Sequence, residues 1–572
     1  MTYRSTVARG RVALVAVAVA IMVGGALLQP AEAAPPEPVE IKVLSISDWH
    51  AQLDPLFVLG EGTFGGAAQL STFFQQEREE NPNTLTFTAG DAFGASPPLS
   101  NFFNEEPAVR SMRLMGFDAD TFGNHNFDRG VGHLQEMIDI ASAPAGDEPG
   151  EPFQYVSGNL RNVENNLTGV KPFEIFDVAG VKVAAIGITN PEAPGLVFPG
   201  SFGTIEVTDP VPAANKAKAQ ARREGAKVFV ALTHLGVTGF DENGAFGPLI
   251  DFAENVGGFD LILGDHTNVE FSEVINNALV VENRSKGRTY ARMNLSVNPV
   301  SGSVMDSSVE FVDPESAAVE PDPAIVDLLA PLREELNEIL GEVVGESTVF
   351  IPRADACGNG AGRTCESLVG NVVTDALRDA YDTDFALTNA GGLRDALTCP
   401  TTDDPNDFCP EHTAPNFDIS LGQILTVLPF GNSSATLEMD GALLKEFLEH
   451  GVSEMPAADG RFAQVSGLCF TYDISAPIGS RVQSAVRQAE DGSCTGDPVD
   501  LTENSSFTVA TNDFVASGGD EYPDVSSLMV TRAVMDQDVA DYISANTPIS
   551  PAIEGRIECV TTGTPACPVV SP

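Results

Sequence analysis

The chain has 572 residues, of which 43% are hydrophobic and 20% are charged. This is enough apolar material for large cores and too much length for one ordinary domain, so we expect two domains. The 81 acidic and 31 basic residues give a formal net charge of −50 at pH 7. Because neutralising phosphates requires Lys and Arg, this charge argues against binding of nucleic acid polymers through a basic face.

The first 33 residues are typical of a signal peptide. Arg4, Arg9 and Arg11 precede an apolar run over residues 12–28, and residues 31–33 have the small-x-small form of a cleavage site. The alternative is an uncleaved membrane anchor, because the run is close to the shortest length that spans a bilayer. No later segment has the character of a transmembrane helix. We therefore expect a secreted or cell-envelope protein with no stable membrane span after signal removal.

Residues 34–315 alternate short apolar runs of strand character with helical stretches, which is the pattern of a layered α/β domain. Four of these runs lead to residues that can bind a metal ion, namely the runs at 41–47, 84–88, 226–232 and 259–263. In open α/β sheets, ligands bind beyond the carboxyl ends of the strands. We therefore expect the side chains after these four runs to converge.

A linker helix is predicted over residues 316–342. Residues 313–323 are rich in Pro, Glu and Asp, and the stretch 324–340 has apolar side chains at helical spacing. These are Ile325, Leu328, Leu329, Leu332, Leu336 and Leu340. The remainder, residues 343–572, mixes strands, helices and Gly-rich turns, and we expect it to form an independent α/β domain.

All eight cysteines lie in this C-terminal part, and none belongs to a C-x-x-C metal pattern. In an exported protein, disulfides are a better interpretation than free thiols. Pairing of neighbours in chain order gives four short loops, and this is the pairing we expect. The cysteines are Cys357, Cys365, Cys399, Cys409, Cys469, Cys494, Cys559 and Cys567.

Five short motifs contain potential metal ligands. In chain order they are D-x-H at 48–50, G-D at 90–91, G-N-H-x-x-D at 123–128, T-H at 233–234 and G-x-H-x-N at 264–268. One carboxylate, such as that of Asp91, can bridge two cations about 3.5–4 Å apart. Each motif alone is a weak signal. Four of the seven histidines, however, fall in these motifs. If the motifs did not form one site, several unrelated polar turns would have to imitate one.

This order of motifs resembles the calcineurin-like metallophosphoesterases, and its spacing resembles their 5′-nucleotidase branch. The resemblance implies an α/β fold, with a four-layer β-sandwich flanked by helices and followed by a separate α/β C-terminal domain. It implies that one ion is surrounded by Asp48, His50, Asp91 and Asn268. It implies that the other ion is surrounded by Asp91, Asn124, His234 and His266. It also implies that His125 stabilises the transition state and protonates the leaving oxygen, with Asp128 orienting its ring.

The implied cofactors are two divalent metal ions. Nitrogen and oxygen ligands suit Zn²⁺, which we expect, and also Mn²⁺, Co²⁺ or Mg²⁺. Asp265 replaces a common small residue next to His266. It is either a hydrogen-bond acceptor behind the ligands or a solvated acid, and we favour the solvated acid. Trp49, the only Trp of the chain, is expected to pack beside the site.

A second ordered set of motifs lies in the C-terminal domain. It comprises Arg363 in R-T-C-E-S, Asn389 and Arg394 in N-A-G-G-L-R, Phe430 in L-P-F-G-N, and Phe514 and Asp520 in T-N-D-F-V-A-S-G-G-D. Singly, such residues are more often structural, but together they resemble the 5′-nucleotidase C-terminal domain. The resemblance implies that the two Phe rings stack on a nucleobase and the two Arg side chains bind phosphate. Asn389 would contact the base or sugar, and Asp520 the ribose.

These features predict a secreted two-metal phosphohydrolase that removes phosphate from small-molecule nucleotides, a 5′-nucleotidase. A 2′,3′-cyclic-nucleotide 2′-phosphodiesterase/3′-nucleotidase or a UDP-sugar diphosphatase is an alternative with the same mechanism. A non-catalytic nucleotide-binding surface protein is the alternative of a different class. It predicts broken metal motifs, whereas the motifs are intact. The oligomeric state stays unknown from the sequence.

Overall fold

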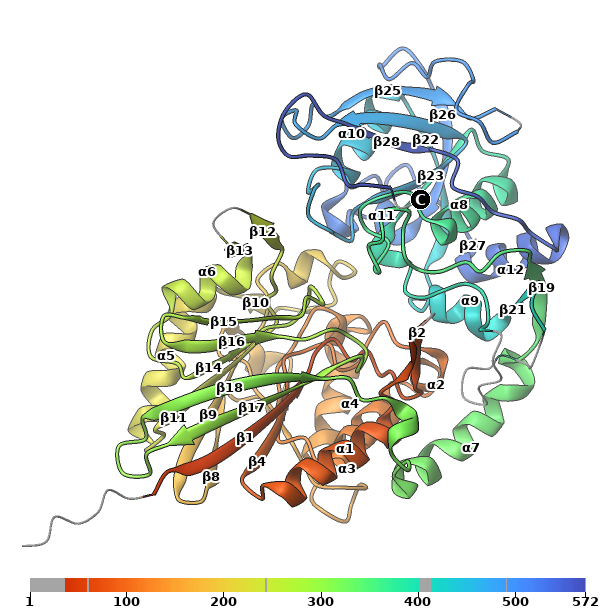
Figure 1. Ribbon diagram of the computed structural model, residues 1–572. Coiled ribbons are helices and arrows are strands. Elements are labelled where there is room, and N and C mark those ends of the chain that lie inside the picture. The colour runs from red at the N-terminus through yellow and green to blue at the C-terminus, as the bar shows by residue number, and fades with distance from the viewer. Residues whose placement is uncertain are drawn as a thin grey trace, which may run out of the picture. The chain divides into compact units, whose positions relative to one another are not determined.

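The computed structural model describes residues 37–58, 61–241, 244–400, 409, 413–489 and 491–570 (Figure 1). The predicted signal peptide, residues 1–33, lies outside these ranges. No helix within them is long and apolar enough to cross a membrane.

The N-terminal domain contains two six-stranded sheets. The first has the strand order β18-β17-β1-β4-β5-β6, in which β1, β4, β5 and β6 are parallel and β17 and β18 are antiparallel to their neighbours. The bounds of its strands are β1 Val39–Ile46, β4 Thr84–Thr88, β5 Ala119–Asp120, β6 Gln154–Tyr155, β17 Tyr290–Val297 and β18 Val304–Val312.

The second sheet has the order β15-β16-β14-β11-β9-β8, with β16, β14, β11 and β9 parallel. The bounds of its strands are β8 Phe173–Val178, β9 Val181–Ile188, β11 Val228–Thr233, β14 Leu261–Leu263, β15 Phe271–Ile275 and β16 Ala278–Glu282. The inner faces of the two sheets share one apolar core, in which Val43 of the first sheet lies with Val230 of the second.

Helices cover the outer face of each sheet (Figure 1). Side chains of β1 alternate between the two sides, so that Ile41 lies in the core between the sheets and Leu44 lies in the core beneath the helices. The first sheet is covered by α1 Ala67–Glu80, α3 Glu106–Met115 and α4 Gly130–Ser142, and the second by α5 Pro210–Arg223 and α6 Pro248–Asn255. Two sheets between two helical layers give the four-layer sandwich predicted from the sequence, which is thereby confirmed.

Helix α7, Pro323–Leu340, covers the apolar stretch predicted to be helical, whereas residues 316–322 hold only the short 3-10 turn Ser316–Ala318. The first turn of α7 is set by Asp322, whose side chain accepts a hydrogen bond from the backbone N–H of Ala324, and by proline at the first helical position. The apolar stripe packs on the core beneath α1 and α3. Its fully buried members are Ile325, Leu329, Leu336 and Leu340.

The C-terminal domain is a separate α/β unit, as predicted. Its five-stranded sheet has the order β23-β20-β26-β22-β27, with β20 Phe385–Asn389, β22 Ser433–Met439, β23 Ala463–Ser466, β26 Phe507–Asn512 and β27 Val530–Val534. A three-stranded sheet consists of β24 Leu468–Asp473, β25 Val482–Arg487 and β28 Ile557–Val560. The main helices are α8 Leu368–Tyr381, α9 Leu421–Val427, α10 Gly441–Gly451 and α12 Met535–Asn546.

Shorter elements connect these layers. They are β2 Leu56–Val58, β3 Gly62–Phe64, α2 Pro98–Asn101, β7 Leu160–Arg161, β10 Glu206–Val207, β12 Gly239–Asp241, β13 Gly244–Phe246, β19 Val343–Ser347, β21 Phe417–Ser420 and α11 Asp513–Ala516.

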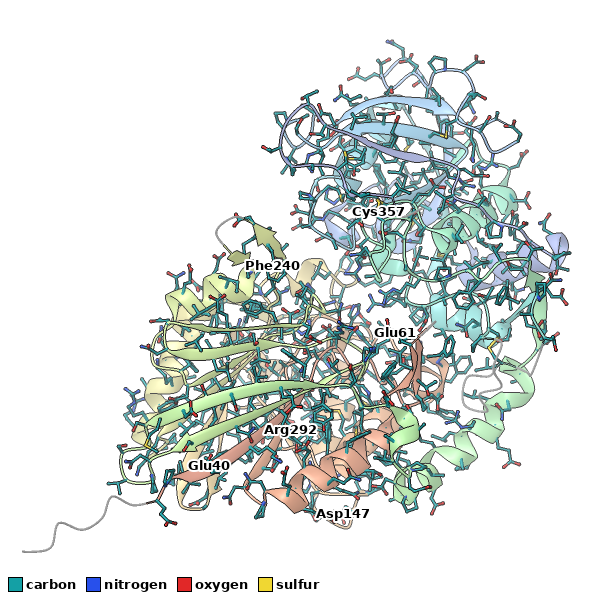
Figure 2. All side chains as sticks on the ribbon, viewed as in Figure 1. Glu40, Glu61, Asp147, Phe240, Arg292 and Cys357 are labelled. Carbon is teal, nitrogen blue, oxygen red and sulfur yellow. A yellow bond between two sulfur atoms is a disulfide. The ribbon has the colours of Figure 1, made fainter. Side chains whose placement is uncertain are left out.

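Four disulfides lie in the C-terminal part, and they confirm the pairing of neighbours in chain order. The pairs are Cys357–Cys365, Cys399–Cys409, Cys469–Cys494 and Cys559–Cys567. Cys357 is labelled in Figure 2. The first disulfide closes the loop that carries Arg363, one of the predicted substrate-binding residues.

Candidate active site

Strand ends from both sheets place the predicted metal ligands. Asp48 and His50 follow β1, and Asp91 follows β4, the parallel neighbour of β1. His234 follows β11, and His266 follows β14, the parallel neighbour of β11. Because the carboxyl ends of parallel neighbours meet at one edge of a sheet, the two pairs of strands bring these side chains together.

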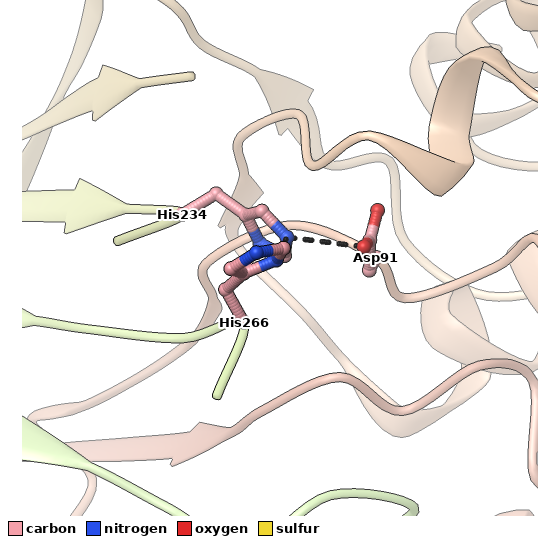
Figure 3. Close-up of side chains that lie close together, drawn as sticks. All are labelled: Asp91, His234 and His266. Atoms are coloured by element: carbon pink, nitrogen blue, oxygen red, sulfur yellow. Dashed lines mark hydrogen bonds and ion pairs between the residues drawn. The ribbon is translucent and has the colours of Figure 1, made fainter. Parts of the chain in front are cut away.

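Distances between the ligand atoms confirm that these side chains converge. His234 Nε2 lies 3.0 Å from Asp91 Oδ2 and 3.1 Å from His266 Nδ1 (Figure 3). Asp48 Oδ1 lies 3.7 Å from His50 Nε2, and Asp48 Oδ2 accepts a hydrogen bond of 2.7 Å from the backbone N–H of His266. Asp48, His50 and Asp91 form one group of potential ligand atoms within 4.8 Å of one another, and Asp91, His234 and His266 form another.

The two predicted amide ligands supply a test of whether this set fits metal ions. The side-chain oxygens Oδ1 of Asn124 and Asn268 are buried and have no hydrogen-bond partner in the described part of the chain. A buried acceptor without a partner is costly, and a cation satisfies it. Carboxylate, imidazole and amide donors together suit divalent ions, so the residues fit the implied cofactor.

The backbone around these ligands adopts conformations that side chains disfavour. Asp48, His50, Asp91, His266 and Asn268 have φ angles of 37°, 49°, 48°, 85° and 61°. Strain of this kind accumulates at functional sites, where the surrounding structure enforces it.

Glycines permit the close packing of the turn at 90–91 against the turn at 123–124. A Cβ atom on Gly123 would lie 2.1 Å from Asp91 Oδ1, and a Cβ atom on Gly90 would lie 2.5 Å from the backbone nitrogen of Gly123. The G-D and G-N-H motifs therefore require glycine because their turns touch each other beside Asp91.

Charges within the cluster oppose the effect of burial on the pKa values of Asp91 and His234. Burial would raise the pKa of Asp91, but neighbouring His234 and His125 lower it well below its usual range. Burial would lower the pKa of His234, but Asp91 and Asp48 raise it to about 9. Burial and the charge of His234 lower the pKa of His266 to about 4. An ionised Asp91 in a buried site is an electrostatic attractor for cations.

His125 and Asp128 form a hydrogen-bonded pair beside the candidate metal ligands. His125 Nδ1 lies 3.0 Å from Asp128 Oδ2, and the same carboxylate oxygen accepts a hydrogen bond of 3.2 Å from the backbone N–H of Ala95. The backbone N–H of His125 donates to Asp91 Oδ1 at 2.8 Å. The imidazole is thus oriented by one carboxylate, while its backbone is anchored to another.

One cavity of about 960 Å³ connects these residues with the predicted substrate-binding residues. On the metal side it is lined by Asn124, His125, Asp128, His266 and Asn268. On the other side it is lined by Arg363, Asn389, Arg394, Phe430, Phe514 and Asp520. All six residues selected from the C-terminal motifs therefore face the same cavity, although they are far apart in the sequence.

The C-terminal residues also have defined neighbours. The ring of Phe430 is stacked on that of His125 at a centroid distance of 5.6 Å, and the ring of Phe514 contacts Phe198 edge-on at 5.8 Å. Asn389 Nδ2 donates to Asp520 Oδ2 at 2.7 Å. These contacts place aromatic faces and a carboxylate–amide pair in the cavity.

Arg394 reaches the metal side of the cavity. Its Nη2 lies 3.1 Å from Nε2 of His50. Burial, reinforced by the neighbouring charge of Arg363, lowers the pKa of Arg394 to about 10. Two neighbouring guanidinium groups in a buried cavity indicate a site for an anion.

Five basic residues that line the cavity were not selected from the sequence, namely Arg129, Arg284, Lys286, Arg288 and Arg353. Of these, Lys286 donates from Nζ to Asp395 Oδ2 at 2.7 Å and to the carbonyl of Arg394 at 3.1 Å. None of the five belongs to a motif. Their role could have been suspected only because basic residues are scarce in a chain of net charge −50.

The interpretation of Asp265 as a solvated acid is wrong, because its side chain is fully buried with 0% exposure. The turn that carries His266 at a φ of 85° places Asp265 against the ligand cluster instead of in solvent. Trp49 is also 0% exposed and belongs to the apolar core beneath the helices, which confirms its predicted packing role.

Comparisons with known proteins agree with this geometry. A family model for calcineurin-like phosphoesterases matches residues 41–270, and a family model for the 5′-nucleotidase C-terminal domain matches residues 343–527. The endonuclease YhcR of Bacillus subtilis (strain 168) is 27% identical over 92% of this chain, and the 5′-nucleotidase of Homo sapiens is 26% identical over 94% of this chain and 93% of its own length. The crystal structure of a 5′-nucleotidase precursor from Thermus thermophilus has a TM-score of 0.77 at 26% identity and covers 91% of this chain and 99% of that chain.

The chain is therefore of the class that combines an N-terminal calcineurin-like phosphoesterase domain with a C-terminal domain of the 5′-nucleotidase type. Within that class, the chain belongs to the 5′-nucleotidase family. The chain spans 41% of the length of the Bacillus relative. The family resemblance inferred from the motifs is confirmed.

Proposed function

We propose that the protein is an exported two-metal phosphohydrolase that removes phosphate from nucleotides, a 5′-nucleotidase. The observation that carries this proposal is the single cavity in which the His125–Asp128 pair and the ligands His266 and Asn268 face aromatic and arginine side chains. The phosphate of a nucleotide would bind at the His125–Asp128 pair, the metal ligands and the arginines, and its base would bind between the aromatic side chains. Relatives named 5′-nucleotidase support the same assignment.

Seven residues form the proposed metal centre. Asp48, His50, Asp91 and Asn268 would hold one ion, and Asp91, Asn124, His234 and His266 the other. When bound, two divalent cations supply Lewis-acid stabilisation of the phosphoryl oxygens and make water a competent nucleophile near neutral pH. The metal identity proposed is Zn²⁺, with Mn²⁺, Co²⁺ or Mg²⁺ as alternatives.

Four side chains are proposed to transfer the proton and to bind the phosphate. Asp128 holds His125 Nδ1, so His125 presents Nε2 to the substrate and donates a proton to the leaving oxygen. Arg363 and Arg394 bind the phosphate through forked, charged donors and position it in front of the metal centre.

Further side chains in the cavity would bind the nucleoside. Phe430 and Phe514 stack on the base, Asn389 contacts the base or sugar, and Asp520 binds the ribose. In this scheme residues 34–315 perform the chemistry, residues 316–342 link the domains, and residues 343–572 select the substrate. Four disulfides fit an extracytoplasmic location.

A substrate panel tests the proposal directly. The purified protein, supplied with Zn²⁺ or Mn²⁺, is offered AMP, 3′-AMP, 2′,3′-cyclic AMP and UDP-glucose, and released phosphate is measured. We expect AMP to have the highest kcat/KM. A preference for 2′,3′-cyclic AMP and 3′-AMP, or for UDP-glucose, would replace the 5′-nucleotidase assignment by the corresponding alternative. Binding of AMP without hydrolysis of any of the four would refute the catalytic proposal.

The base-stacking role predicts a selective effect of Phe430→Ala and Phe514→Ala. Because stacking on an aromatic face contributes about 1–3 kcal/mol per base, each change should raise KM for AMP about 5- to 150-fold. Hydrolysis of p-nitrophenyl phosphate, which has no nucleobase, should be much less affected. Steady-state kinetics with both substrates measures the difference.

Thermal melting provides the control for this prediction. Phe514 packs partly against the core of the C-terminal domain, so Phe514→Ala should lower Tm more than Phe430→Ala. Phe240→Ala serves as the matched control, because this ring is 62% exposed and does not line the cavity. Equal losses on both substrates in stably folded variants would show that the rings do not stack on a base.

A further inference from the structure

Asp265 is a second buried acid beside the ligand Asp48. Asp265 is 0% exposed and Asp48 is 2% exposed. The backbone N–H of His266 donates to both, at 2.7 Å to Asp48 Oδ2 and at 3.0 Å to Asp265 Oδ1. The two carboxyl groups therefore share one donor and lie against each other.

The second oxygen of Asp265, Oδ2, is buried and receives no hydrogen bond from an N–H or O–H group of the described residues. Potential ligand atoms of Asp48, His234 and Asp265 all lie within 4.8 Å of one another. Two adjacent buried carboxylates are costly unless they share a proton or a cation lies close to both. Hydrogen bonding to His266 alone does not explain this arrangement, because it uses only Oδ1.

We propose that Asp265 is a third carboxylate of the metal centre, beside Asp48 and Asp91, and that it favours oxygen-preferring divalent cations such as Mn²⁺ over Zn²⁺. The proposal rests on the metal centre of the proposed function. Carboxylate oxygens suit Mn²⁺ and Mg²⁺, whereas imidazole suits Zn²⁺ well. A third buried carboxylate therefore increases the affinity for divalent ions in general and for the harder ions most.

The test is the variant Asp265→Asn, which retains a side-chain oxygen for the N–H of His266 and removes the negative charge. Wild type and variant are stripped of metal, and the dissociation constants for Mn²⁺ and Zn²⁺ are measured by calorimetry or chelator competition. We expect the Kd for Mn²⁺ to rise at least 10-fold and the Kd for Zn²⁺ to rise less. Asp260→Asn is the matched control. Asp260 lies just before the same strand, β14, and its Oδ2 accepts a hydrogen bond from the backbone N–H of Phe229, outside the ligand cluster.

Thermal melting separates a metal role from a structural role. If Asp265 serves the cations, the metal-free variant should melt at the same temperature as metal-free wild type or higher, because one buried acid has been removed. The rise in Tm on adding Mn²⁺ should be smaller than in wild type. A metal-free variant that melts at lower temperature but shows an unchanged Mn²⁺-induced rise would overturn the proposal.

Unchanged dissociation constants for both ions would also overturn it. If Asp265→Asn does not fold, Asp265→Ser gives the same comparison with a smaller acceptor. Wild-type metal content and AMP hydrolysis are measured in parallel. A wild type that binds metal and hydrolyses AMP, together with a variant of unchanged affinity, refutes only the role of Asp265. A wild type that binds no metal refutes the proposed function as well.

Discussion

Replacing His125 by alanine is expected to lower kcat for AMP by about 10²–10⁴-fold, the usual contribution of a positioned general acid. His125 Nδ1 is held by Asp128 at 3.0 Å, so Nε2 is the nitrogen left for a substrate in the cavity. Because the proton is transferred only in the transition state, kcat and kcat/KM should fall by similar factors. Steady-state kinetics with AMP at saturating metal measures both.

Metal content distinguishes a catalyst from a ligand at this position. The contact of residue 125 with Asp91 runs through the backbone N–H, 2.8 Å from Oδ1, and alanine retains it. Elemental analysis should therefore find wild-type metal content in His125→Ala. Loss of one ion in the variant would contradict the assignment and make His125 a ligand.

His133→Ala is the matched control for this experiment. His133 is a nearby imidazole at the cavity, but its Nε2 lies 2.8 Å from the carbonyl oxygen of Asn104 and is thereby used in a structural hydrogen bond. Its loss should leave kcat near that of wild type. A comparable fall in both variants would indicate a general disturbance of the cavity wall instead of a specific role of His125.

The convergence of the ligands was predictable because of a simple physical regularity. Asp48, Asp91, His234 and His266 each follow an apolar run, and parallel strands buried on both faces appear in a sequence as such runs. Once these runs are assigned to parallel strands, their carboxyl ends must meet at sheet edges. The spacing of Ile325 and Leu329 predicted α7 for a similar reason, since one apolar face of a helix needs a core.

Other features could not be predicted because they depend on contacts between distant segments. The sequence does not distinguish a buried acid such as Asp265 from a solvated one. Only the turn at His266 shows that the carboxyl group of Asp265 is buried. Lys286 and Arg353 belong to no motif, and they enter the site through the packing of loops against the cavity. The partition of the strands between two sheets also depends on tertiary packing, because β17 pairs with β1 across more than 200 residues.

Exhaustive chelation is expected to abolish hydrolysis of AMP, and added Zn²⁺, Mn²⁺ or Co²⁺ is expected to restore it. Without cations, the buried oxygens Oδ1 of Asn124 and Asn268 have no partner in the described part of the chain. The ionised carboxylate of Asp91 is then stabilised mainly by the neighbouring imidazoles of His234 and His125. The protein is treated with chelator and dialysed to remove it, and phosphate release is measured before and after each ion is added.

Melting curves recorded on the same samples show whether the loss of activity reflects metal loss or unfolding. An ion that binds only the folded state stabilises it by about 4 kcal/mol at a concentration 1,000 times its Kd, so the stripped protein should melt at lower temperature and recover with metal. The four disulfides are chemically unaffected by a chelator and should preserve the C-terminal domain. Full activity after stripping, with metal loss confirmed by elemental analysis, would refute two-metal catalysis. The convergence of Asp48, Asp91, His234 and His266 would then require a different explanation from cation binding.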